Sequence, residues 1–120
     1  MIGFVQVMAG GAIGSVLRYG LSLALPGRDG WPWPTFAANI VGGFAMGLLA
    51  AMLVRGDVSE GARLFLGVGL LGGFTTFSAF SLEGFRMIER GQWTLAGGYA
   101  LASVFGSVAA LALGYVLARG

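Results

Sequence analysis

The chain has 120 residues, of which 57% are hydrophobic and only 10% are charged, whereas a soluble domain carries about 25% charged residues. Because so few charges cannot cover a water-facing surface, the apolar excess must face lipid. The sequence contains no histidine and no cysteine, which excludes a disulfide framework, a zinc site and a Ser-His-Asp triad. The net charge of +2 is too small and too thinly spread to indicate a nucleic-acid partner.

Four apolar segments follow one another along the chain, each long enough to cross a bilayer as a helix of roughly 20 residues. A turn cluster, PGRDG at 26–30, ends the first segment, and the tryptophans of WPWP at 31–34 suit an interfacial aromatic belt at the start of the second. In the polar connector before the third segment, Ser59 is placed to cap the next helix. The sequence predicts one all-α transmembrane domain, 1–120, of four antiparallel helices with spans at about 2–25, 33–54, 60–90 and 93–118.

The third segment carries an unusual stretch, LGGFTTFSAFS at 71–81, in the middle of an uncharged run. Each residue of its glycine pair weakens a helix by about 1 kcal/mol relative to alanine, and the β-branched Thr75 and Thr76 compete for backbone hydrogen bonds. We therefore expect the third helix to break mid-membrane, where free backbone groups must be buried in protein or line a wet cavity. Carbonyls that end the first half could hold a cation, and amides that begin the second half could attract an anion. The alternative is a plain kink, or close packing through Gly69 and Gly73.

Two phenylalanines and two serines follow the expected break. Phe77 and Phe80 are three residues apart and share one face of a helix, with Ser78 and Ser81 on an adjacent face. Because the edge of a phenylalanine ring is positive, ring edges turned into a pore could help to solvate a small anion. The alternative is a pair of ordinary core or lipid-facing phenylalanines.

The fourth segment contains two patterns that repeat every four residues. Tyr99, Ser103 and Ser107 form a ladder of hydroxyls on one side of the predicted helix, about 100° from a stripe of small residues. The ladder could donate hydrogen bonds to a passing ion, or its hydroxyls could bond to carbonyls of their own or a neighbouring helix. The stripe is suited to close helix contact and consists of Gly98, Ala102, Gly106, Ala110 and Gly114.

Three further polar residues lie inside the predicted spans. Asn39 must find partners in hydrocarbon, so it faces the bundle interior, either as a link between helices or as a donor along a pathway. Arg18 is the most costly of the three, and it could reach the interface or draw anions into a vestibule. Glu83 could pair with Arg18 or Arg86, or simply mark the interface.

The arginines favour neither orientation of the chain. Positive residues in short loops set membrane topology, and a chain with a tie could insert both ways and form an antiparallel homodimer. The alternative is a single orientation set by folding or by partners. Four spans leave little interior in one chain, so oligomerisation is expected. The side of the membrane that holds the N-terminus receives Arg55, Arg63 and Arg119, and the other side receives Arg28, Arg86 and Arg90. When Arg18 is added, the count of arginines on the two sides is still only four to three.

Four motifs in this order resemble the CrcB/Fluc family of fluoride channels over essentially the whole chain. The resemblance implies passive, selective export of fluoride from the cytoplasm, by an antiparallel dual-topology homodimer with two pores in a bacterial inner membrane. One departure is Ala79, where the family's motif has threonine. The motifs are GGAIGSVLRY at 10–19, NIVGG at 39–43, GGFTTFSAFSLE at 72–83, and the tyrosine and two serines of the hydroxyl ladder at 99–107.

The resemblance also implies roles for individual residues. The backbone carbonyls of Gly72 and Thr75 from both chains would hold a structural sodium ion at the dimer centre. Arg18 and Glu83 match the family's arginine and acid, and Ser81 is a further candidate near the pathway. The fluoride pathways would be lined by Asn39, Phe77, Phe80, Tyr99, Ser103 and Ser107.

A small multidrug-resistance-like transporter is the main alternative, because it would share the length, the four spans and the antiparallel dimer. Such a proton-coupled transporter needs a carboxylate well inside the membrane, and Glu83 is the only candidate. Another alternative is a non-transporting assembly subunit, in which the small-residue stripes only pack helices. The hydroxyl ladder and the broken third span argue against it. The missing histidine and cysteine argue against an enzyme.

Overall fold

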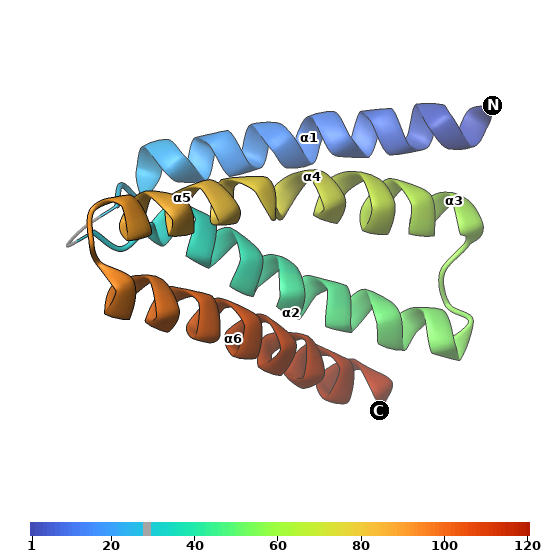
Figure 1. Ribbon diagram of the computed structural model, residues 1–120. Coiled ribbons are helices and arrows are strands. Elements are labelled where there is room, and N and C mark those ends of the chain that lie inside the picture. Colours follow the sequence, from blue (N-terminus) through green and yellow to red (C-terminus); the bar gives the residue numbers. More distant parts are fainter. Residues whose placement is uncertain (28–29) are drawn as a thin grey trace.

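The computed structural model describes residues 1–27 and 30–120, and its regular secondary structure there is helical. Four helical spans lie alongside one another, and both termini lie at the same end as the connector between the second and third spans (Figure 1). Each span is long and apolar enough to cross a membrane, so the prediction of four membrane helices is confirmed. Arg28, on which the arginine count depends, lies outside the described residues. The elements are α1 (Ile2–Ala24), α2 (Trp33–Arg55), α3 (Glu60–Ala62), η1 (Arg63–Leu71), α4 (Gly72–Phe74), α5 (Ser78–Glu89) and α6 (Trp93–Arg119).

The spans pack mainly as two pairs, α1 with η1 and α4, and α2 with α6. Small residues allow this close approach, as is usual between membrane helices. At Gly14 of α1, the backbone of Leu70 lies where a side chain would stand, and at Gly47 of α2 the backbone of Leu111 does the same. Of the small-residue stripe on α6, Gly114 rests against the backbone of Phe44, whereas Gly98 faces open space. The stripe therefore packs in its second half but not at its start.

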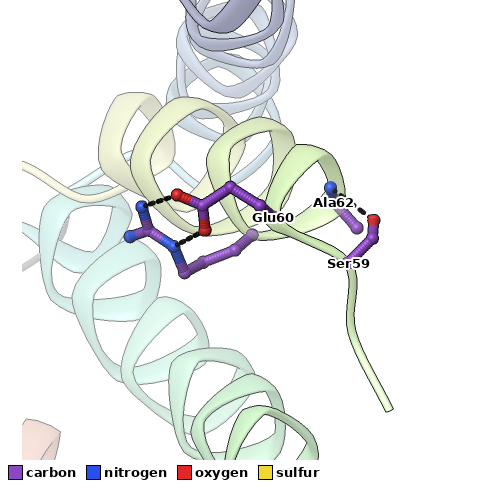
Figure 2. A network of polar contacts seen from close by, with 4 residues as sticks. Ser59, Glu60 and Ala62 are labelled. Carbon is purple, nitrogen blue, oxygen red and sulfur yellow. Dashed lines mark hydrogen bonds and ion pairs between the residues drawn. The ribbon is translucent and has the colours of Figure 1, made fainter. Parts of the chain in front are cut away.

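A capped turn begins the third span. Ser59 Oγ accepts a hydrogen bond from the amide of Ala62 at 3.1 Å, so the predicted cap is confirmed. Arg63 binds the carboxylate of Glu60 through two nitrogens, at 2.7 and 2.8 Å, as Figure 2 shows beside the cap. The chain then continues as a π-helix, η1, a rare and wide form that frequently occurs at functional sites.

The third span breaks after α4, in the stretch where the sequence predicts it. Thr75 has extended backbone angles, φ −85° and ψ 159°, and α5 begins only at Ser78. The break lies between the two pairs of helices, because η1 and α4 contact both α1 and α2. This position brings the interrupted backbone next to the polar residues of α2 and α6.

Candidate functional site

An open groove of about 430 Å³ runs along the break, between α2 and α6. Among the described residues, none of those lining it is charged. Its floor is mostly apolar, with a small number of hydroxyl, amide and backbone groups, which is the usual make-up of a site for a small ligand. The polar lining residues are Asn39, Thr75, Thr76, Ser103 and Ser107, and the others are Gly42, Gly43, Met46, Leu71, Gly72, Phe77, Phe80, Val104, Val108 and Leu111.

Asn39 links α2 to the break through both ends of its amide. Its Nδ2 donates to the carbonyl of Thr76 at 3.1 Å, and its Oδ1 accepts from the amide of Thr76 at 2.9 Å. A buried amide in hydrocarbon is expected to find such partners. Since Nδ2 carries two hydrogens, one N–H remains for another acceptor in the groove.

Two carbonyls at the end of the first half-helix lose their helical donors to side chains. In a continuous helix the amide of Thr76 would donate to the carbonyl of Gly72, but here it donates to Asn39. The amide of Ala79 would likewise donate to the carbonyl of Thr75, but it donates to Thr76 Oγ1 at 3.1 Å. Both carbonyls lie at the negative end of a half-helix, and both residues line the groove. The donor set, backbone oxygen only, fits a small hard cation.

Arg18 covers the opposite side of the same half-helix end. Its Nε donates to the carbonyl of Gly73 at 3.2 Å. A cation at the C-terminal end of a helix is favourable because of the helix dipole and the unpaired carbonyls. The guanidinium therefore finds a partner on the third span rather than only reaching for the interface.

An aromatic row leads from the break towards α6. Phe77 is 79% exposed, and its ring centroid lies 5.7 Å from that of Phe80. Phe80 lies 5.1 Å from Tyr99, whose ring is fully buried and meets Trp31 edge-on. Phe77 and Phe80 therefore lie together at the groove, although Phe77 precedes the first residue of α5.

The three hydroxyls of the α6 ladder differ in their hydrogen bonding. Tyr99 donates to Glu83 Oε1 at 3.1 Å, and Ser107 Oγ lies 3.5 Å from the carbonyl of Asn39. Ser103 is only 6% exposed, and its Oγ has no hydrogen-bond partner among the described residues. An unpaired buried hydroxyl is costly in an apolar setting, so Ser103 is the ladder residue best suited to bind a ligand in the groove.

Glu83 binds hydroxyls with both carboxylate oxygens. Thr35 donates to Oε2 at 3.0 Å, and Tyr99 donates to Oε1. In the described part of the chain it forms no ion pair with Arg18 or Arg86. Glu83 thus ties α5 to both α2 and α6, and of the two alternatives the arginine pair is not the one formed among the described residues.

The comparison with known families identifies the chain. The family described as "CrcB-like protein, Camphor Resistance (CrcB)" matches residues 5–115. The chain belongs to this family. Three of its relatives carry the name "Fluoride-specific ion channel FluC". The one from Phenylobacterium zucineum is 56% identical over 117 residues, 94% of this chain and 92% of its own length.

The other two relatives are similar to the chain over a comparable length. The relative from Mesorhizobium japonicum is 50% identical and covers 99% of this chain and 98% of its own length. That from Sphingopyxis alaskensis is 50% identical over 94% of this chain and 92% of its own length. Since the helices are long and apolar enough, membership of the CrcB-like family supports a multi-pass membrane protein.

Two residues contribute to this site that sequence reasoning did not include among the candidate site residues. Thr35 precedes Asn39 by four residues and so shares its helix face, a spacing that could have revealed it. Thr76 caps α5 through its side chain, and a threonine just before a helix is a recognisable capping signal. Ser81, a predicted candidate, instead donates to the carbonyl of Phe77 at 2.9 Å and supports the first turn of α5.

Proposed function

We propose that this chain is a fluoride-selective passive channel that exports fluoride from the bacterial cytoplasm across the inner membrane. The observation that carries the proposal is the membership of a family whose similar relatives are named fluoride-specific ion channels. The groove supports it independently, because it offers hydrogen-bond donors without a fixed charge.

Fluoride is small and strongly hydrated, so it leaves water only where several donors approach it closely. The hydroxyl of Ser103 and the second N–H of Asn39 are such donors, and both residues line the groove. The edges of Phe77 and Phe80 would add a weak positive potential. Because conduction requires binding that is weak enough for release, the absence of a cation among the described lining residues suits a channel. Tyr99 and Ser107 would continue this pathway along α6.

We further propose that two copies assemble in opposite orientations. The groove is open along one side in the single chain, and a second copy would close it against lipid. The near-equal distribution of arginines favours insertion in both orientations. Since each copy carries one groove, the dimer would have two pores.

The carbonyls of Gly72 and Thr75 would hold a structural sodium ion between the two copies. Their helical donors are engaged by side chains, so their oxygens are available for a cation. A bound sodium ion would join the two breaks at the dimer centre. Arg18 would satisfy a further carbonyl at this end, that of Gly73, by donating a hydrogen bond to it.

Efflux from liposomes tests the function. Vesicles containing the pure protein are loaded with fluoride or with chloride, and release is followed with an ion-selective electrode while a potassium ionophore balances charge. We expect fast fluoride release with chloride retained, and no release from protein-free vesicles. If fluoride stays trapped while an organic cation exchanges for protons, the chain is a transporter of the multidrug-resistance type.

A further inference from the structure

The two hydrogen bonds between Asn39 and Thr76 connect the α2 helix to the broken backbone. We propose that Asn39 is a positioning residue that creates the cation site, by holding the amide of Thr76 away from the carbonyl of Gly72. This inference rests on the proposed cation site and assigns Asn39 a task besides lining the groove.

The geometry of the contact supports this role. Asn39 Oδ1 accepts from the amide of Thr76 at 2.9 Å, and Nδ2 donates to the carbonyl of the same residue at 3.1 Å. One side chain thus satisfies both backbone groups of a residue that has left the helix, at a depth where unsatisfied groups are very unfavourable. The extended conformation of the preceding Thr75 is compatible with this arrangement.

Removing the acceptor at position 39 has a definite consequence for the backbone. The amide of Thr76 must then find another acceptor, because water is scarce in the membrane interior. The acceptor that this amide has in a continuous α-helix is the carbonyl of Gly72. A carbonyl that accepts this hydrogen bond is a poorer cation ligand, so sodium binding should weaken.

The same residue also touches the proposed anion path. The backbone carbonyl of Asn39 lies 3.5 Å from Ser107 Oγ, and its side chain borders the groove with Ser103. A residue that only binds fluoride would alter the response to fluoride and leave the response to sodium unchanged. The response to sodium therefore separates the positioning role from the lining role.

The experiment measures how sodium stabilises the purified full-length protein, with sodium replaced by N-methylglucamine at constant ionic strength. A ligand that binds only the folded state raises the melting temperature as its concentration exceeds its Kd. For Asn39→Ala, the sodium concentration that gives the wild-type rise in Tm should be higher by up to about tenfold, the upper end of the effect of one hydrogen bond. Asn39→Asp keeps an acceptor for the amide of Thr76, so it should retain the response. The matched control Ser103→Ala lines the same groove without touching the break and should also retain it.

Three outcomes would overturn the inference. An unchanged sodium response in Asn39→Ala would mean that the amide of Thr76 does not control the cation site. A loss in Asn39→Asp as large as in Asn39→Ala would do the same, and this variant decides the matter if Asn39→Ala does not fold. If the wild-type protein shows no sodium response, the proposed cation site is wrong and the inference is wrong with it. The proposed fluoride function is tested separately, by fluoride efflux from wild-type vesicles, and would not be contradicted by this result.

Discussion

Gly14 on α1 lies against the broken third span and offers a sharp test of the packing. A Cβ at this position would fall on the carbonyl oxygen of Leu70 and 2.8 Å from the amide nitrogen of Phe74. Neither backbone atom can rotate away, so Gly14→Ala must push α1 from the third span. Overpacking typically lowers the free energy of unfolding by about 1–3 kcal/mol, whereas the higher helix propensity of alanine raises it by about 1 kcal/mol. Because the added methyl group would clash with backbone atoms, we take the upper end of the overpacking range and expect a net loss of about 2 kcal/mol in the free energy of unfolding.

Gly20 on the same helix provides the matched control, because a Cβ there would meet nothing within 4 Å. Gly20→Ala should leave stability unchanged or raise it by up to about 1 kcal/mol. Both variants are unfolded by denaturant in detergent at one fixed protein concentration, so that the proposed assembly of two copies contributes equally to both measurements. If Gly14→Ala is as stable as Gly20→Ala, the close contact between α1 and the third span is wrong. Fluoride efflux should fall in Gly14→Ala only.

Two further predictions concern the aromatic row. Phe77→Ile and Phe80→Ile should each reduce fluoride efflux sharply while the elution volume of the protein in size-exclusion chromatography stays unchanged. Unchanged efflux in both variants would mean that the two rings do not line the fluoride pathway. Tyr99→Phe removes a fully buried hydroxyl that binds Glu83, which should cost about 1–3 kcal/mol in denaturant unfolding. The control Tyr19→Phe, 65% exposed, should change stability by less than about 0.5 kcal/mol, and equal losses in the two variants would contradict the contact with Glu83.

The features that could be predicted from the sequence are those set by neighbouring residues. The spans follow from the length of the apolar runs, and the break follows from a glycine pair and two threonines within a few residues. The face shared by Tyr99, Ser103 and Ser107 follows from helical periodicity alone. Each of these depends on local backbone preference or on the regular geometry of one helix.

The partners of the polar side chains could not be predicted in this way. Asn39 and Thr76 are separated by 37 residues, and Arg18 and Gly73 by 55, so their contacts depend on how the spans pack. For Glu83 the sequence left open an arginine pair or a place at the interface, and neither alternative named the two hydroxyls that bind its carboxylate oxygens. Periodicity defines a face of a helix but does not say which neighbour covers it.

The most direct test of the account is the reversal potential of the purified protein in a planar bilayer. With a tenfold fluoride gradient, a passive fluoride channel gives a reversal potential at the Nernst potential of fluoride, about 59 mV for a single charge. We predict that this value is unaffected by opposing gradients of chloride or protons. A reversal potential that follows chloride would contradict selectivity, and one that shifts with the proton gradient would contradict passive conduction of fluoride alone.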